Sequence, residues 1–201
     1  MKMKKCNFGK FKELCDVHKR GSSSFMMHDH KKVFNLMGIK NGFSVLDLGC
    51  GPGDYSIEAA KIVGLSGVVY AMDKNSDLVE DVAARADGEN LSNIKTIVGD
   101  ITERLPFEDG SIDVCMAITV LHIPAISKKM SSLFREIGRV LKLGGDLITI
   151  DVKKEDPSFG PPMNMRLSPE DIEMSMYGSC LQKVGLEDLG YNYMLRFRKA
   201  G

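Results

Sequence analysis

The sequence predicts an α/β protein with a mostly parallel sheet and helices on both of its faces. From about Phe43 onward, short apolar runs alternate with longer amphipathic runs, which is typical of parallel strands connected by helices. A glycine-rich stretch, VLDLGCGPGDYS at 45–56, includes the end of the first apolar run, where folds of this class bind ligands. The length of 201 residues suits a single domain, with residues 1–40 as an N-terminal helical cap and residues 41–201 as the core.

The elements expected at the start and middle of the chain follow this alternation. A helix over 22–39 starts with serines that can cap it and places four side chains on one face: Met26, His30, Val33 and Met37. Five runs rich in valine and isoleucine predict the parallel strands: FSVLDL, GVVYAM, IKTIV, IDVCMAI and GDLITIDV. A helix over 126–145 lies between the last two runs, and we expect Gly144 and Gly145 to end it as a C-cap.

The C-terminal quarter predicts a loop, a short helix and a hairpin. Residues 155–169 are rich in proline and glycine and predict a mobile loop, which we expect to close over a bound substrate. Ser168 is the expected N-cap of the next helix, and Pro169 is its expected first residue. The runs LEDLGY and YMLRFRK are too close together for a helical crossover, so we expect them to pair as antiparallel strands.

Composition and charge exclude several classes of protein. The chain has 27 basic and 27 acidic residues, so it has no overall positive field and we expect no nucleic-acid partner. Its five cysteines are odd in number and scattered, which indicates reduced thiols and a cytoplasmic location. No apolar run follows the basic N-terminus, so we expect neither a signal peptide nor membrane insertion. Nothing in the sequence indicates an oligomeric state.

The glycine-rich stretch predicts a particular kind of ligand. It lacks the Gly-Lys-Ser/Thr of a phosphate-binding loop, and Asp47 would repel a pyrophosphate but suits an ammonium or sulfonium group. Asp73 ends the second strand, where a carboxylate accepts hydrogen bonds from ribose hydroxyls. Asp100 follows the third strand, where it can accept a hydrogen bond from an exocyclic amine. A ribose, an adenine and a cationic tail together describe S-adenosylmethionine.

Four segments strengthen this interpretation: VLDLGCGPG, VVYAMDKN, VGDITERLPFEDGSIDVCMAITVLHI and LFREIGRVLKLGGDLITID. In order and spacing they resemble the class I S-adenosylmethionine-dependent methyltransferases, within which the chain looks like the ubiquinone/menaquinone-biosynthesis (type 11) group. The resemblance covers about residues 42–151. It implies a Rossmann-like, doubly wound sheet of seven strands whose last strand is antiparallel.

The resemblance also assigns donor contacts to residues of this chain. The loop Gly49–Gly53, which includes Cys50 and Gly51, would hold the methionine part together with Asp47, and Asp73 would hold the ribose. Asp100 and the backbone of Ile101 would hold the adenine. Further expected contacts with S-adenosylmethionine, or with its product S-adenosylhomocysteine, come from Lys74 and Ala117. The first residues of the next helix, Asp54 and Tyr55, either contact the donor or only favour the helix start.

Methyl transfer from a sulfonium requires alignment of the acceptor more than any universal catalytic residue. An acceptor that must lose a proton still needs a base, and His122 in TVLHIP is the candidate, with simple packing as the alternative. A small-molecule acceptor is favoured, since DVCMAITVLH lacks both the Asn/Asp-Pro-Pro-aromatic box and the Pro-Cys nucleophile of DNA methyltransferases.

The sequence also raises three other interpretations: a metal site, an oxidoreductase and a non-catalytic binding domain. Four residues near the N-terminus have side chains that zinc accepts, but their spacing fits no zinc module, so we expect no metal: Cys15, His18, His28 and His30. Asp47 argues against a nicotinamide-dependent oxidoreductase with a related fold. A non-catalytic domain that binds the donor or its product, with a regulatory or scaffolding role, would carry the same donor motifs.

Overall fold

The structure is a computed structural model that describes residues 23–156, 158 and 160–201. Its seven strands form one sheet in the order β3-β2-β1-β4-β5-β7-β6. The strands are β1 (Ser44–Leu48), β2 (Val68–Asp73), β3 (Ile94–Val98), β4 (Ile112–Ile118), β5 (Leu141–Val152), β6 (Leu181–Asp188) and β7 (Asn192–Lys199). Strands β1 to β5 are parallel to one another, and β7 is antiparallel to both of its neighbours. The predicted mostly parallel sheet with an antiparallel last strand is confirmed.

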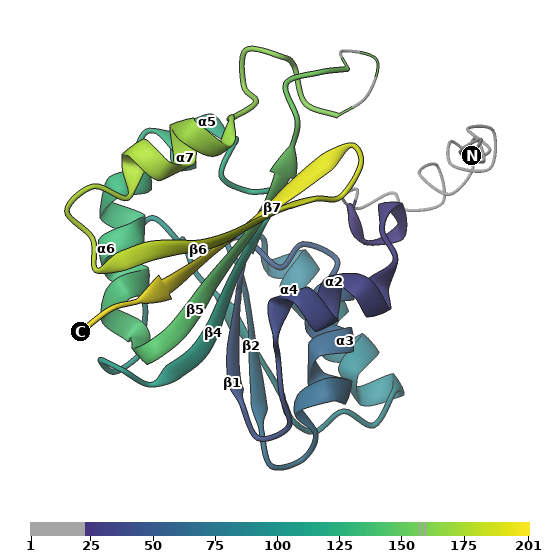
Figure 1. The fold of residues 1–201 in the computed structure, drawn as a ribbon. Helices are drawn as coiled ribbons and strands as arrows, with labels where there is room; N and C mark the ends of the chain where they lie inside the picture. The colour runs from purple at the N-terminus through teal and green to yellow at the C-terminus, as the bar shows by residue number, and fades with distance from the viewer. Residues whose placement is uncertain (1–22, 157, 159) are drawn as a thin grey trace.

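Helices cover both faces of the sheet (Figure 1). On one face lie α2 (His30–Met37), α3 (Asp54–Val63) and α4 (Ser76–Gly88). The other face carries α5 (Pro124–Ser127), α6 (Met130–Val140) and α7 (Pro169–Ser175). Successive side chains of a strand point to opposite faces, so the strands β1, β2, β4, β5 and β7 each supply buried residues to two separate cores.

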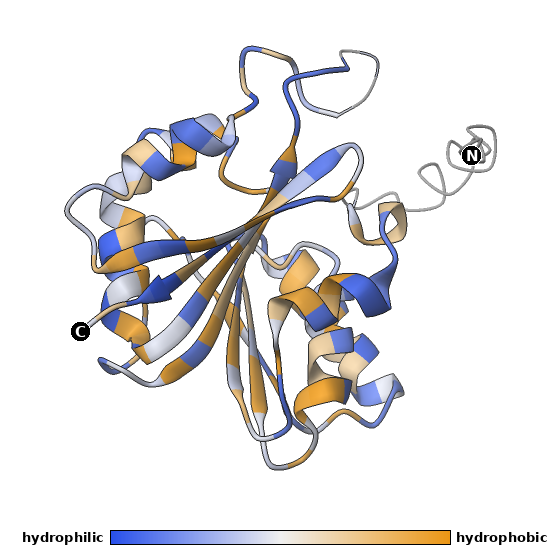
Figure 2. Ribbon diagram, in the orientation of Figure 1, coloured by the Kyte–Doolittle hydropathy of each residue, from blue (hydrophilic) through white to orange (hydrophobic). Residues whose placement is uncertain are grey.

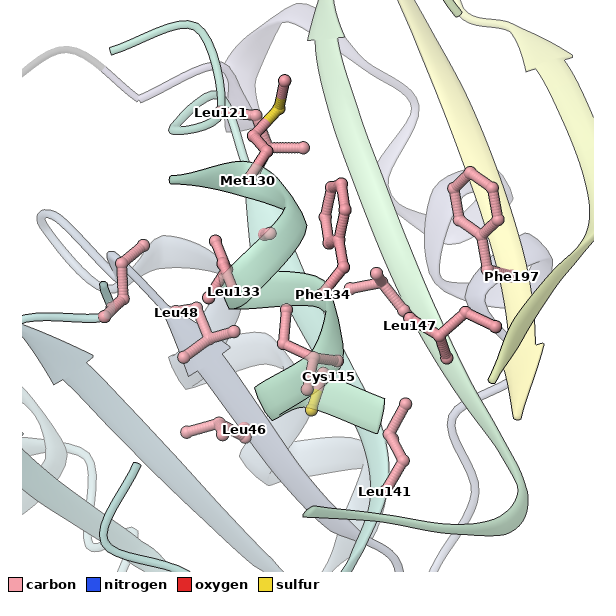
Figure 3. Close-up of a cluster of buried hydrophobic side chains, with 14 of the residues drawn as sticks. Leu46, Leu48, Cys115, Leu121, Met130, Leu133, Phe134, Leu141, Leu147 and Phe197 are labelled. Atoms are coloured by element: carbon pink, nitrogen blue, oxygen red, sulfur yellow. The ribbon is translucent and has the colours of Figure 1, made fainter. Parts of the chain in front are cut away.

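The core between α6 and the sheet is the larger of the two. One face of α6 contributes Met130, Leu133 and Phe134, which pack against side chains of β1, β4 and β5 (Figure 3). The opposite core contains Val33 and Met37 of α2 together with buried residues of α3 and the sheet. Colouring by hydropathy shows apolar residues concentrated along the central strands, while the edge strand β6 contains both apolar and polar residues (Figure 2). The shared carboxyl edge of β1 to β5 is therefore held rigidly from both sides.

The expected C-cap at Gly144 and Gly145 was wrong. Helix α6 ends at Val140, and β5 begins at once with Leu141. Gly144 has φ +76°, and it lies in β5 where the pairing with β4 shifts register. A Cβ on Gly145 would lie 2.9 Å from the carbonyl oxygen of Asp113. These glycines therefore form an irregularity within the strand, because the backbones approach too closely there for side chains.

The N-terminal helix is also shorter than predicted. A 3-10 turn, η1 (Phe25–Met27), is separate from α2, which begins after Asp29. The carboxylate of Asp29 accepts a hydrogen bond from the backbone N–H of Lys32 at 3.1 Å, so Asp29 is the cap rather than the expected serines. Met26 consequently lies on the separate turn and is exposed, while Val33 and Met37 are buried as expected. The rest of the proposed cap, residues 1–22, lies outside the described residues.

The loop between β5 and α7 is organised around one buried arginine. The Arg166 guanidinium donates hydrogen bonds to the carbonyl oxygens of Lys153, Asp156 and Pro161, at 2.7 to 2.8 Å. At the end of this loop, Ser168 and Asp171 form a capping box that starts α7, as the sequence predicts for Ser168. The loop is thus tied to the end of β5.

Candidate functional site

The glycine-rich loop between β1 and α3 needs glycine for two different reasons. Gly49, Gly51 and Gly53 have φ values of +73°, +54° and +80°, which L side chains rarely adopt. A Cβ on Gly49 would lie 2.6 Å from Val120, and one on Gly53 would lie 2.5 Å from Val82. A Cβ on Gly51 would meet nothing within 4 Å. The outer glycines allow close packing of the protein, while Gly51 leaves open space beside the loop.

Asp73 braces this loop from the end of β2. One carboxylate oxygen accepts a hydrogen bond from the Gly51 N–H at 3.0 Å, and the other accepts from the Asn75 N–H at 3.0 Å. The side chain that caps α4 belongs to Asn75 and not to Asp73. Because each carboxylate oxygen has two acceptor sites, both oxygens of Asp73 retain capacity for a further hydrogen bond.

Asp47 is a carboxyl group with an unusual environment. Its side chain is buried beneath α3 and accepts a hydrogen bond from the Ser56 hydroxyl at 2.6 Å. Burial raises the pKa of Asp47 to about 7, since the hydrogen bond from Ser56 only partly offsets the loss of solvent and the charge of Asp73 adds to the increase. A cationic group bound beside Asp47 would stabilise the ionised carboxylate and so lower its pKa again.

A cavity of about 180 Å³ lies at the carboxyl edge of the sheet and brings several predicted residues together. The predicted donor residues that line it are Asp47, Gly49, Cys50, Gly51 and Asp73. The other described residues that line it are Ser23, Ser24, Tyr55, Ile118, Thr119, Val120 and Ile123. This lining includes two acidic side chains and no lysine or arginine within the described part of the chain. The cavity therefore suits a cationic ligand.

The remaining predicted donor residues lie outside this cavity. Gly53 packs beneath the loop against Val82, and Lys74 is exposed. Asp100 is also exposed, and its Oδ1 accepts hydrogen bonds from the N–H and the hydroxyl of Thr102, both at 2.8 Å. These two hydrogen bonds hold the pKa of Asp100 below its usual range. Ile101 and Ala117 have side chains buried in the core, so only their backbones are available to a ligand.

Two residues of the cavity, Thr119 and Ser24, had no signal in the sequence. Thr119 has φ +52°, although β-branched residues strongly disfavour this conformation. Its N–H donates to the carbonyl of Ile150 at 2.7 Å, which ties the end of β4 to β5. Ser24 lies 3.3 Å from the hydroxyl of Tyr55, so residues before α2 reach the cavity. Tyr55 itself lines the cavity, whereas Asp54 pairs with Arg85 at 3.0 Å.

His122 lies next to the cavity and has a buried partner. Its Nδ1 is 2.9 Å from Oδ1 of Asp151, near the end of β5. The His122 side chain is 14% exposed, and the Asp151 side chain is fully buried. Sequence reasoning missed Asp151, although the run GDLITIDV carries an acid near its end much as the second strand does at Asp73.

Two other cavities among the described residues differ from this one in that their linings include lysine side chains. A larger cavity, of about 430 Å³, lies at the opposite edge of the sheet, and most of its charged side chains are paired with one another: Lys142 with Asp113, and Arg196 and Arg198 with Asp146. The described residues contain no cluster of three metal ligands. His30 stacks on Phe25 at 3.7 Å, while Cys15 and His18 lie outside the described residues. None of the described helices is long and apolar enough to span a membrane.

Comparison with known proteins gives the family context of this site. Residues 39–194 match the family model described as a methyltransferase domain. A demethylmenaquinone methyltransferase from Lactococcus lactis is 35% identical over 130 residues, which are 64% of this chain and 50% of that protein. The chain therefore spans about half the length of the curated relatives it matches.

Solved structures show how widely the fold is used. A S-adenosylmethionine-dependent methyltransferase from Aquifex aeolicus superposes with a TM-score of 0.81 at 25% identity, covering 98% of this chain and all of that one. The [4+2]-cyclase SpnF superposes with a TM-score of 0.70 at 20% identity, covering 85% of this chain and 81% of that one. The likeness to SpnF concerns the fold alone.

Proposed function

Since the chain belongs to the methyltransferase-domain family, we propose that it transfers a methyl group from S-adenosylmethionine to a small-molecule acceptor. The observation that carries this proposal is the acidic cavity at the carboxyl edge of the sheet, beside the glycine-rich loop. A cavity with Asp47 and Asp73 and no described basic side chain fits a sulfonium and an ammonium group, and it would repel the pyrophosphate of a dinucleotide.

Each donor contact has a proposed chemical role. Asp47 pairs with the α-ammonium group of the methionine part, and Asp73 accepts hydrogen bonds from the ribose hydroxyls through its remaining acceptor sites. The open space beside Gly51 lets the donor approach the backbone. We propose that Asp100 and the Ile101 backbone hold the adenine, and that Lys74 and Ala117 lie at the edge of the same site.

The reaction depends mainly on alignment. The donor already carries an activated leaving group, and proximity and orientation supply roughly 7 to 11 kcal/mol in favourable cases. His122 lies in the segment Val120–Ile123, whose two end residues line the cavity. It is the proposed group that accepts a proton from the acceptor.

The acceptor is proposed to be a small organic molecule, and the relatives named demethylmenaquinone methyltransferase make a hydroxylated aromatic compound the first class to test. The equal numbers of acidic and basic residues give no support for a nucleic-acid acceptor. A cytoplasmic location remains our proposal, supported by the free cysteines of the described part: Cys50, Cys115 and Cys180.

Calorimetric titration with S-adenosylmethionine, S-adenosylhomocysteine and NAD tests donor binding directly. We expect both adenosyl ligands to bind and NAD not to bind. Asp73→Ala removes charge-assisted hydrogen bonds worth about 1.5 to 3 kcal/mol each, so it should weaken donor binding at least about tenfold. Asp87→Ala, at an exposed position on the far end of α4, is the matched control for the lost charge.

Two results would contradict the proposal. Binding of NAD alone would indicate an oxidoreductase. Unchanged donor affinity in Asp73→Ala would remove the ribose assignment. Methylation of any acceptor, detected with a ¹³C-methyl donor, would reject the alternative of a non-catalytic binding domain.

A further inference from the structure

The pairing of His122 with Asp151 lies where the donor and the acceptor would meet. Val120 and Ile123 line the cavity on either side of His122 in the chain. The hydrogen bond from Thr119 to the Ile150 carbonyl holds this segment against β5, directly before Asp151. The pair is therefore held at the ends of β4 and β5, next to the proposed donor site.

Asp151 has an environment that structural stability does not explain. It is fully buried, and its Oδ1 contacts His122 Nδ1 and the Val152 N–H, both at 2.9 Å. Its Oδ2 is buried without a hydrogen-bond partner among the described residues. Burying an unpaired carboxylate oxygen destabilises a fold, and proteins tolerate such groups mainly where they serve function.

The same contact decides which ring nitrogen of His122 carries the proton. An ionised carboxylate only accepts hydrogen bonds, so Nδ1 of neutral His122 is protonated and Nε2 keeps its lone pair. No described protein group forms a hydrogen bond with Nε2, and the ring is partly exposed. His122 is thus presented with a free basic nitrogen beside the cavity.

We propose that Asp151 is a positioning residue that holds His122 as a general base, and that the acceptor therefore carries an ionisable hydroxyl group, as phenols and enols do. This inference rests on the proposed methyl transfer and deepens it. An amine attacks through a lone pair that it already has, and a thiol ionises readily near neutral pH. A hydroxyl group is the acceptor that most needs a positioned base.

The proposed step balances as follows. The hydroxyl proton passes to Nε2 of His122, which becomes an imidazolium stabilised by Asp151. The acceptor, through its oxygen or through a carbon conjugated with that oxygen, forms a bond to the methyl carbon while the methyl–sulfur bond breaks. The electron pair of the broken bond stays on sulfur, which turns the sulfonium into a thioether. In the case of carbon attack, the ring C–H proton then moves to the oxygen, and in both cases the imidazolium proton leaves to water.

The first test measures the His122 tautomer by ¹⁵N NMR of the full chain, with the signals assigned through His122→Gln. We expect Nδ1–H in the wild type and a shift toward Nε2–H in Asp151→Ala. Asp146→Asn, on the same strand but nearer the opposite edge of the sheet, should leave the tautomer unchanged. A wild-type His122 that carries its proton on Nε2, or a tautomer unaffected by Asp151→Ala, would overturn the positioning role.

The second test compares acceptors of different acidity. With S-adenosylmethionine and ¹³C-methyl detection, His122→Gln and Asp151→Ala should slow transfer to catechol about 100-fold or more. Transfer to 4-nitrocatechol, which is largely ionised near neutral pH, should fall less than about tenfold, because it needs no base. An equal loss for both probes, or transfer to aniline but to neither phenol, would overturn the inference. The position of the ¹³C-methyl group in the product distinguishes oxygen from carbon attack.

Donor binding separates a failure of this inference from a failure of the proposed function. Both variants should bind S-adenosylmethionine with the wild-type affinity in calorimetry, since neither residue lines the donor cavity. If the wild-type protein itself does not bind the donor, the proposed function is wrong. If donor binding is intact and the tautomer or acidity tests fail, only the inference is wrong.

Discussion

At the scale of single residues, Gly49 and Gly51 predict separable effects on stability and on binding. Gly49→Ala combines a left-handed backbone conformation with a clash against Val120, so it should lower the free energy of unfolding by about 3 kcal/mol. Gly51→Ala meets no protein atom and should cost only about 1 kcal/mol. Its methyl group would occupy open space in the donor cavity, so donor affinity should fall severalfold or more.

Urea denaturation and calorimetry measure these two quantities on the same preparations. Equal stability losses for the two variants would show that Val120 moves aside at no cost. Unchanged donor affinity in Gly51→Ala would show that the donor does not approach the loop there.

Asp47 predicts a dependence of donor binding on pH. The pKa of about 7 in the free protein means that Asp47 is mostly protonated at pH 6. A donor ammonium group requires the ionised form, so binding below pH 7 releases a proton and affinity should rise about fivefold from pH 6 to pH 7. The stability of the free protein has the opposite trend: because folding raises this pKa, the contribution of Asp47 falls as pH rises from about 4 to 7.

Calorimetry in buffers of different ionisation enthalpy counts the released proton, which should approach one per donor at pH 6. Asp47→Asn is the control, because it should bind more weakly and with a flat profile over this range. A wild-type affinity independent of pH between 6 and 7 would contradict the pairing of Asp47 with the ammonium group.

At the scale of elements, the central parallel strands could be predicted because their side chains are buried on both faces. The hairpin could be predicted because its two runs are too close together for a helical crossover. Runs such as IDVCMAI have few alternatives to a central strand. The edge strand β6 was less visible, since Leu181–Asp188 has mostly exposed side chains and was expected only from Leu186 onward. Gly144 and Gly145 gave the same local signal as a helix cap, and only the pairing of β4 with β5 distinguishes the two.

The residues of the candidate site also divide into those with a local signal in the sequence and those without one. Asp47, Asp73 and the glycines were predictable because strand ends and turn glycines have local signals. Three residues were not predicted: Thr119, Ser24 and Asp151. Thr119 has a positive φ that is unusual for a β-branched residue. Ser24 and Asp151 act through contacts with residues 31 and 29 positions away in the chain. Tertiary context alone supplies that information.

The β5–α7 loop predicts a mutational effect at this scale. Arg166→Lys keeps the charge but loses the planar fork that reaches three carbonyl oxygens, so the free energy of unfolding should fall by about 2 kcal/mol. Amide hydrogen exchange in residues 153–156 and 160–165 should become faster, with little change in β1 or β2. Arg135→Lys, on the exposed side of α6, is the matched control. Unchanged exchange in the loop would show that Arg166 does not organise it.

At the scale of the whole molecule, the two edges of the sheet have different tasks. The carboxyl edge carries Asp47, Asp73 and Asp151, each buried or partly buried without a lysine or arginine partner among the described residues. The amino edge carries Asp146, which accepts hydrogen bonds from Arg196 and Arg198 at 2.6 to 3.1 Å and so ties β7 to β5. Burial alone would raise the pKa of Asp146, but these two arginines outweigh it and hold the pKa below its usual range.

This division predicts that stability and function can be lost independently. Asp146→Asn should lower the free energy of unfolding by about 2 kcal/mol, less than for a fully buried pair because the arginine side chains are 29% and 46% exposed. Its donor affinity should match the wild type, since the cavity lies at the other edge. Asp151→Asn should affect function rather than stability. The free energy of unfolding should change by less than about 1 kcal/mol, because one oxygen of the lost carboxylate had no hydrogen-bond partner among the described residues. Transfer to phenolic acceptors should be slower. This contrast can be measured on both variants by urea denaturation, donor calorimetry and transfer to catechol. If each variant lost stability and transfer together, the two edges would not be independent.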